Sequence, residues 1–134
     1  MICLDTNAVI AIMNQDVIVQ RRLISAQTAG EIIAISVIVL FELRYGAEHS
    51  RRRDENHVRI DAFLEAVEVH DVDADDAFEA AKVREALARV GKPIGPLDLI
   101  IATQARRRGA AIVTANTKEF SRVPGLRCLN WLQH

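Results

Sequence analysis

The sequence of 134 residues is 50% hydrophobic and 26% charged, with a formal net charge of −1 at pH 7, which is the balance of an ordinary globular protein. The length suits a single domain over residues 1–134 with one continuous core. The charge excludes a polycation drawn to nucleic acid over its whole surface, and the absence of an apolar run near about 20 residues excludes a membrane-spanning protein.

Short apolar segments alternate with longer amphipathic segments along the chain. The predicted order is strand 2–4, helix 9–13, helix 16–28, strand 32–36, helix 37–49, a helix around 60–67, strand 67–72, helix 80–90, helix 96–108, strand 111–114 and strand 126–129. Gly30, Gly91 and Gly109 supply stop signals, and Pro96 suits the first position of a helix. The alternation predicts an α/β fold with three layers, in which helices cover both faces of a short central parallel sheet.

The N-terminal residues and the cysteines indicate the compartment. The first residues have neither the basic segment nor the long apolar segment of a signal peptide, so we expect a cytoplasmic protein. Cys3 and Cys128 lie in apolar segments near opposite ends of the chain and match no zinc-binding spacing. We therefore expect two small buried side chains and no disulfide.

Four acidic residues occupy equivalent places in the predicted fold. Asp5 follows the first strand, and Glu42 lies on the helix after the second. Asp98 lies in the first turn of the helix that begins at Pro96, and Glu119 follows the strand 111–114 by five residues. Ligands of open parallel sheets bind beyond the carboxyl ends of the strands, so these four side chains are candidates for one site.

Each acid also has a local explanation. Asp5 could cap a helix, Asp98 could interact with a helix dipole, and Glu42 could pair with a nearby base. Asn116 and Glu119 could form a capping box. Carboxylates that converge instead would repel one another and have raised pKa values unless a cation compensated them. Oxygen ligands without a nearby Cys or His favour Mg²⁺ or Mn²⁺ over zinc.

Four stretches that contain these acids occur in a characteristic order: LDTN at 4–7, FELRYG at 41–46, IGPLDLIIA at 94–102 and VTANTKEF at 113–120. Together they resemble the motifs of the PIN-domain ribonucleases, and among these the VapC-type toxins of bacterial toxin–antitoxin pairs. The match spans nearly the whole chain. It implies the PIN version of the three-layer α/β/α fold and a metal-dependent ribonuclease.

The resemblance also implies a role for each motif residue. Asp5 and Asp98 would be the principal metal ligands, and Glu42 would complete the catalytic pocket, binding the metal directly or through water. Glu119 would be the fourth catalytic acid, at a position that varies in the family and is often Asp. The polar residues that would line or support the pocket are Thr6, Asn7, Thr114 and Asn116. The cofactor would be Mg²⁺ or Mn²⁺.

The implied reaction is hydrolysis of RNA phosphodiester bonds by an activated water. The target stays open between tRNA anticodon loops and other structured RNAs. The implied partners are a second copy of the chain in a homodimer and a VapB-like antitoxin. Among the arginine clusters at 21–22, 51–53 and 106–108, the best candidates for RNA contact are Arg51, Arg52 and Arg53, although a solvated helix face is the simpler explanation for any one cluster.

Other functions have weaker support. The four histidines, His49, His57, His70 and His134, share no motif, which disfavours cleavage through the 2′-hydroxyl by paired acid–base groups. The acids at 71–76 resemble a calcium loop but lack its Gly and its final Glu, so we expect them to favour the N-terminus of the following helix. A PIN-like protein-binding module without catalysis remains the competing hypothesis.

Overall fold

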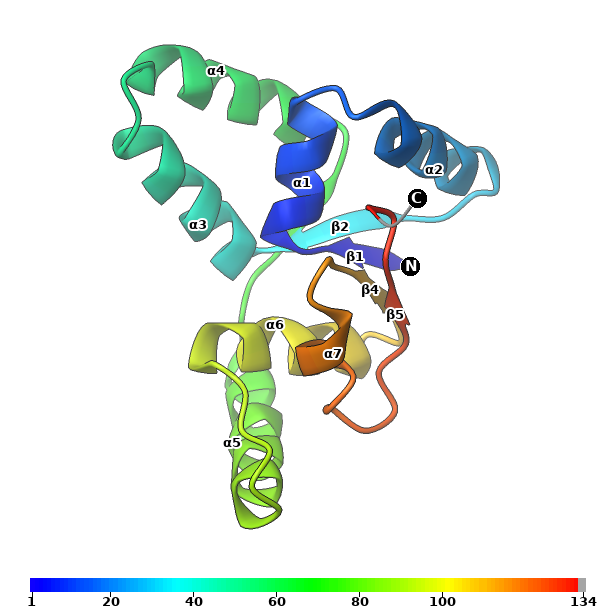
Figure 1. The fold of residues 1–134 in the computed structure, drawn as a ribbon, viewed down its shortest axis with the longest axis vertical. Coiled ribbons are helices and arrows are strands. Elements are labelled where there is room, and N and C mark those ends of the chain that lie inside the picture. The colour runs from blue at the N-terminus through cyan, green and yellow to red at the C-terminus, as the bar shows by residue number, and fades with distance from the viewer. Residues whose placement is uncertain (133–134) are drawn as a thin grey trace.

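Five parallel strands form the centre of the computed structural model, which describes residues 1–132 (Figure 1). The strands are β1 (Ile2–Leu4), β2 (Ile33–Ser36), β3 (Glu68–His70), β4 (Ala111–Val113) and β5 (Cys128–Leu129). Their order in the sheet is β3-β2-β1-β4-β5, and every pairing between neighbours is parallel. The predicted parallel sheet is therefore confirmed.

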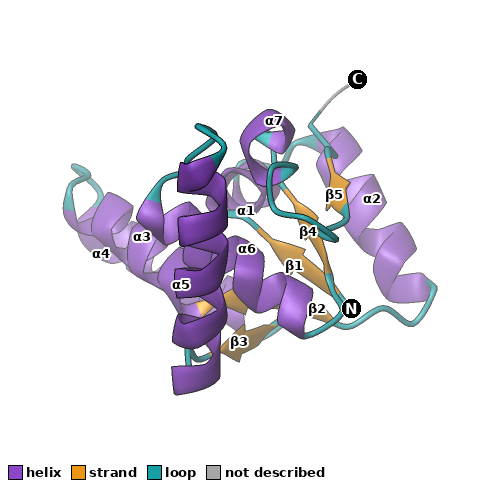
Figure 2. Ribbon diagram, turned by 90° about the horizontal axis from the view of Figure 1, so that it is seen from below, coloured by secondary structure: helices purple, strands orange, loops and turns teal. Residues whose placement is uncertain are grey.

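Seven helices in the described part of the chain surround this sheet. They are α1 (Thr6–Met13), α2 (Val17–Thr28), α3 (Val37–Glu48), α4 (Arg53–Leu64), α5 (Ala74–Arg89), α6 (Pro96–Arg107) and α7 (Thr117–Phe120). In Figure 1, α1 and α2 lie above the sheet, α5 and α6 lie below it, and α3 and α4 form a pair beside α1. Figure 2, seen from below, shows α5 and α6 in front of the strands. The three-layer α/β/α arrangement expected from the resemblance is confirmed.

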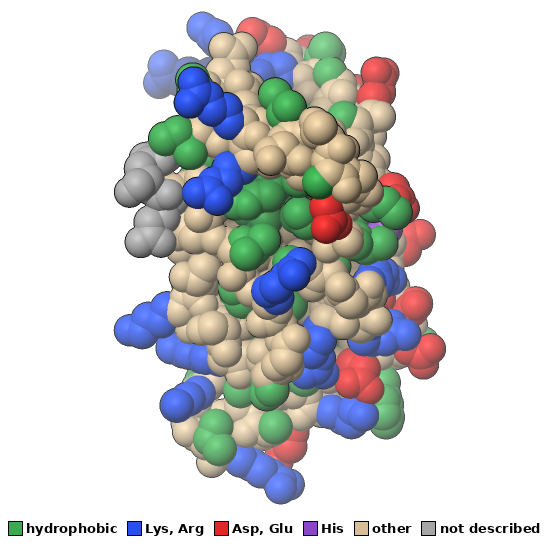
Figure 3. Space-filling view, turned by 90° about the vertical axis from the view of Figure 1, so that its right-hand side faces the viewer, with side chains coloured by type: hydrophobic (Ala, Val, Ile, Leu, Met, Phe, Trp, Pro, Cys, Tyr) green, Lys and Arg blue, Asp and Glu red, His purple; other side chains and the backbone are tan. Residues whose placement is uncertain are grey.

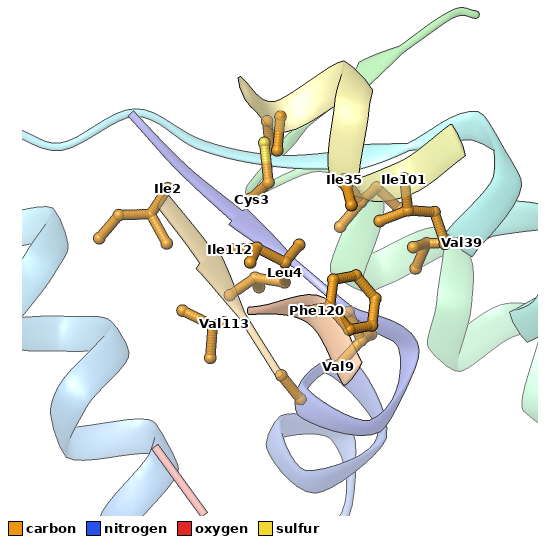
Figure 4. Close-up of a cluster of buried hydrophobic side chains, with 14 of the residues drawn as sticks. Ile2, Cys3, Leu4, Val9, Ile35, Val39, Ile101, Ile112, Val113 and Phe120 are labelled. Carbon is orange, nitrogen blue, oxygen red and sulfur yellow. The ribbon is translucent and has the colours of Figure 1, made fainter. Parts of the chain in front are cut away.

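The core forms around the two central strands. Figure 4 shows side chains from the strands and from the helices on both faces gathered into one cluster. Leu4, Ile35 and Ile112 have no exposed surface. A short parallel strand buried on both faces is apolar throughout, because it has no solvent-facing side. The carboxyl ends of β1 and β4 are therefore fixed in position by dense packing on either side.

Three helices begin earlier than predicted. α1 begins at Thr6 because Asp5 is its N-cap. α5 begins at Ala74, where the side chains of Asp73 and Asp76 each accept the backbone amide of the other in a capping box. α4 begins at Arg53, and its first turns are polar, so the apolar periodicity from Ile60 onward marked its later part alone.

The acids at 71–76 and the arginines at 106–108 meet in one network between α5 and α6. Asp76 is completely buried, and its Oδ1 lies 2.5 Å from Nη1 of Arg107 and 3.0 Å from Nη1 of Arg108. Arg106 pairs with Glu79 at 3.3 Å. This arginine cluster joins two helices, and the acids support the start of α5 as predicted.

The cysteines agree with the sequence-based expectations except that Cys128 is less buried than expected. Cys3 is buried and Cys128 is half-buried, and neither forms a disulfide. Burial raises the pKa of the Cys3 thiol to about 11. No helix within residues 1–132 is both long enough and apolar enough to cross a membrane.

Candidate active site

Asp5 lies at the junction of the two central strands. Its backbone amide donates to the carbonyl of Val113 at the end of β4, which fixes its position beside that strand. One carboxylate oxygen accepts the amide of Thr6 at 2.8 Å, so the expected helix cap is present. The other oxygen accepts a hydrogen bond from the hydroxyl of Thr114 at 2.8 Å and one from the side-chain amide of Asn7 at 3.2 Å. Asp5 is therefore a cap whose second oxygen is held by the neighbouring strand end and by α1.

Glu42 is connected to the same place through Thr6. The hydroxyl of Thr6 donates to Oε1 of Glu42 at 2.9 Å, which links the first turn of α1 to the middle of α3. The alternative in which Glu42 pairs with a nearby base is wrong, because within residues 1–132 no base forms an ion pair with Glu42, and Arg44, two residues away, pairs with Asp61. Glu42 therefore belongs to the group of side chains around Asp5 at the carboxyl end of β1.

Glu119 is connected to the loop that precedes Asp98. Its two carboxylate oxygens accept the backbone amide of Gly95 at 3.0 Å and the side-chain amide of Asn116 at 2.7 Å. These hydrogen bonds hold the pKa of Glu119 below its usual value. The proposed capping box is absent, since the side chain of Asn116 makes no capping bond and donates to Glu119 instead. Glu119 thereby fixes the loop that leads into Asp98.

The other three acids act on Asp98. Burial, and after it the negative charges of Asp5, Glu119 and Glu42 in that order, together raise its pKa to about 6. Within residues 1–132, no Lys or Arg forms an ion pair with any of the four. The four sequence-predicted acids therefore interact across one region, which we call the acidic pocket, and a base acts on one of them, since the charge of Arg122 lowers the pKa of Glu119.

The pocket suits a divalent cation by its chemistry. Its donors are carboxylate oxygens, which Mg²⁺ and Mn²⁺ prefer. In the described residues, no three Asp, Glu, His or Cys side chains are close enough to hold one ion directly, so Asp5, Asp98 and Glu42 do not form a preassembled set of three ligands. Mg²⁺ keeps several waters and commonly binds proteins through one or two carboxylates, so this arrangement fits a partly hydrated ion.

The other candidate residues lie outside this cluster. Arg51, Arg52 and Arg53 are exposed at the turn between α3 and α4. Their nearest acidic partners are Glu55, at 3.8 Å from Arg52, and Glu48, at 3.6 Å from Arg53. On the face in Figure 3, Lys and Arg side chains are spread from end to end and do not form one stripe. Surface charge alone does not mark a path for RNA.

The histidines take structural positions where the structure describes them. His57 contacts Arg44 and Glu48, His49 stacks on Tyr45, and His70 lies near Glu68. His134 lies outside the described residues. Thr6 was expected among the supporting residues, whereas the contact from the Gly95 amide to Glu119 was missed, and its position in the IGPLD motif is the signal that could have identified it.

Comparison with known proteins identifies the family. The PIN domain model matches residues 2–126. The tRNA(fMet)-specific endonuclease VapC of Shigella flexneri is 43% identical over 129 residues, with 96% of each chain covered. The chain belongs to the VapC family of PIN-domain ribonucleases. Ribonuclease VapC2 of Rickettsia felis is another VapC relative, 37% identical over 128 residues with 96% of each chain covered.

Solved VapC structures agree with this assignment. The VapBC2 complex of Rickettsia felis bound to a promoter DNA fragment contains a chain that matches with a TM-score of 0.89 and 36% identity, covering 98% of this chain and 99% of that one. The DNA-bound VapBC complex of Salmonella typhimurium gives a TM-score of 0.88 and 37% identity, with 97% of each chain covered. The resemblance seen in the four sequence motifs is confirmed.

The hydroxyl of Thr114 gives a first prediction for this VapC-family site. Thr114→Val should lower the free energy of unfolding by about 1–2 kcal/mol, because it removes a buried hydrogen bond to the Asp5 carboxylate. Urea unfolding measures the change. Thr28→Val, at an exposed position on α2, is the control and should change stability by less than about 0.5 kcal/mol. Equal stability of Thr114→Val and wild type would contradict the role of this hydroxyl.

Proposed function

We propose that this VapC-family ribonuclease is a toxin that hydrolyses phosphodiester bonds of tRNA with Mg²⁺ or Mn²⁺. The observation that supports the proposal is that the charges of Asp5, Glu119 and Glu42 raise the pKa of Asp98, as expected of carboxylates that lie near one another. The 43% identical relative is named as tRNA(fMet)-specific, which supports tRNA as the substrate. The chain would form a single PIN domain and act in the cytoplasm, where tRNA is found.

The contacts of the residues support a proposed role for each. Asp5 and Asp98 would hold the metal, and Glu42 and Glu119 would bind its water ligands. A metal held there lowers the pKa of a bound water and stabilises the charge that develops on the phosphate. The support for the carboxylates comes from Thr6, Asn7, Thr114 and Asn116, each of which donates to one of them.

The proposal includes two protein partners and one RNA-binding surface. The matched Rickettsia and Salmonella structures are VapBC complexes, which supports a VapB-like antitoxin for this chain. A homodimer would contain two acidic pockets, one in each subunit. Arg51, Arg52 and Arg53 are exposed and positively charged, so they are proposed to contact the RNA backbone beyond the pocket.

The test is cleavage of bulk tRNA by purified, antitoxin-free protein. Cleavage should require Mg²⁺ or Mn²⁺ and stop with EDTA. Asp5→Asn should lose at least about 100-fold in rate, because it removes a carboxylate that holds the metal. Glu65→Gln, at an exposed position after α4, is the matched control and should cleave at the wild-type rate.

The competing function is a PIN-like binding module without catalysis. The observation in its favour is that no three acids of residues 1–132 are preassembled to bind one ion. The same experiment distinguishes the two functions. A folded wild-type protein that cleaves no tRNA in either metal, or an Asp5→Asn variant that cleaves as fast as wild type, would reject the proposed active site.

A further inference from the structure

A groove adjoins the acidic pocket between α1, α3 and α4. It has a volume of about 230 Å³, and its lining includes Glu42. Ile10, Leu43 and Ile60 form its apolar wall. Because Glu42 is also bound to Thr6 and acts on the pKa of Asp98, the groove and the acidic pocket share this side chain. A substrate held at the acids would extend into the groove.

The far end of the groove carries a positive charge. Arg59 lines it, and its guanidinium donates to the carbonyl of Met13 at the end of α1 at 2.5 Å and to Oδ1 of Asn56 at 3.4 Å. Asn56 in turn donates to Ser50 at 2.9 Å. Among residues 1–132, Arg59 has no carboxylate within ion-pair distance. Its charge is available for an anionic ligand.

We infer that this groove binds one nucleotide of the RNA next to the cleaved bond, with a phosphate on Arg59 and the base against the apolar wall. The inference rests on the proposed ribonuclease function, which requires RNA to continue past the acidic pocket. The order of charges fits a nucleotide chain, since a cation at the acids would attract the scissile phosphate and Arg59 attracts the next one. The amide of Asn14 in the lining is of the kind that reads base edges.

The size of the groove favours a nucleotide over a folded partner segment. A volume of about 230 Å³ is below the range of about 300–1,000 Å³ for drug-sized ligands, and a helix with its side chains is about 10–12 Å across. A space of this size suits a single base better than a helix. The groove would thus determine which nucleotide stands beside the scissile phosphate.

Gly46 allows the groove to be filled without disturbing the core. It follows Glu42 by one helical turn on the same face of α3 and lines the groove. A Cβ atom at this position meets no atom within 4 Å, so a side chain can be added. Gly46→Trp should therefore fill the groove, while Arg59→Gln removes its charge. Val58→Trp, at a 65% exposed position on α4 outside the groove lining, is the matched control.

The experiment measures RNA affinity separately from cleavage. The probe is a fluorescent RNA hairpin with the anticodon loop of initiator tRNA, bound to proteins that also carry Asp98→Asn to prevent cleavage. We expect Gly46→Trp and Arg59→Gln to weaken binding by about 10-fold, and Arg59→Gln to reduce the salt dependence by about one phosphate contact. The Val58→Trp control should bind like its parent. Circular dichroism checks that each variant is folded.

Wild-type cleavage of the same hairpin and of bulk tRNA, measured in parallel, reports on the proposed function alone. If the wild type cleaves RNA and both groove variants bind the hairpin with the affinity of their parent, the nucleotide site is rejected and the ribonuclease stands. The nucleotide site is likewise rejected if the variants keep the affinity of their parent for the hairpin and lose affinity only for an antitoxin protein. If the wild type cleaves neither RNA, the proposed function fails and the inference fails with it.

Discussion

Replacing Asp98 by Asn should stabilise the metal-free protein while it abolishes RNA cleavage. Burial and three neighbouring carboxylates raise the pKa of Asp98 from 3.8 to about 6. The folded state therefore holds the proton more tightly than the unfolded state, and stability falls as the pH rises from about 4 to about 6. Above that window the ionised carboxylate destabilises the fold, and the Asn variant lacks this charge.

The size of this gain in stability follows from the rise in the pKa of Asp98. Two pKa units correspond to about 3 kcal/mol at most, and solvent screening of a partly exposed side chain reduces this to about 1–2 kcal/mol. Urea unfolding of EDTA-treated Asp98→Asn should show this gain over wild type at pH 7 and almost none at pH 4. Glu65→Gln should show no gain at either pH. A loss of stability at pH 7, or cleavage at the wild-type rate, would contradict the account of Asp98.

Replacing Asp76 by Ala should produce the largest loss of stability, about 3 kcal/mol. Asp76 has no exposed surface, accepts hydrogen bonds from Arg107 at the end of α6 and from the next residue, Arg108, and forms half of the capping box of α5. Removing one partner of a buried ion pair typically costs about 3–5 kcal/mol, and the partial exposure of Arg107 and Arg108 places this case at the low end. Asp75→Ala, which removes an 84% exposed carboxylate from the same turn, should cost less than about 0.5 kcal/mol.

The effect of Asp76→Ala should depend on pH in the opposite sense to that of Asp98. Burial by itself would raise the pKa of Asp76, but hydrogen bonds from Arg108, from the Asp73 amide and from Arg107 outweigh it and lower the pKa. A lowered pKa stabilises the fold above the unfolded value of 3.8, and this contribution is lost as the pH falls below it. Wild type and Asp76→Ala should therefore converge in stability below about pH 4. A constant difference down to pH 2 would contradict the ion pair.

The sequence was sufficient for the elements that depend on local pattern. The apolar run at 2–4 and the run at 111–114 were predicted as strands, and β1 and β4 occupy these places. Apolar periodicity detects the buried part of a helix, so it found α4 from Ile60 but missed the polar turns that begin at Arg53. The start of α5 depends on side chain–backbone bonds at Asp73, which periodicity does not represent.

The contacts that assemble the site join distant segments and could not be predicted from local pattern. Thr6 and Glu42 are 36 residues apart, and Gly95 and Glu119 are 24 apart. Their pairing depends on how the strands are ordered in the sheet. The acids themselves could be chosen from the sequence, because each follows a strand end or begins a helix in a family motif. Their metal-binding roles remain a prediction.

The position of β4 in the sheet determines when the acidic pocket can form during synthesis of the chain. Residues 111–113 pair directly with β1, which the ribosome makes first, and β4 also separates β1 from the edge strand β5. Asp5 depends on this late strand, since its backbone and carboxylate bind Val113 and Thr114. A growing polypeptide that ends before β4 therefore contains no assembled acidic pocket. A cell that makes this toxin is exposed to it only after nearly the whole chain has left the ribosome.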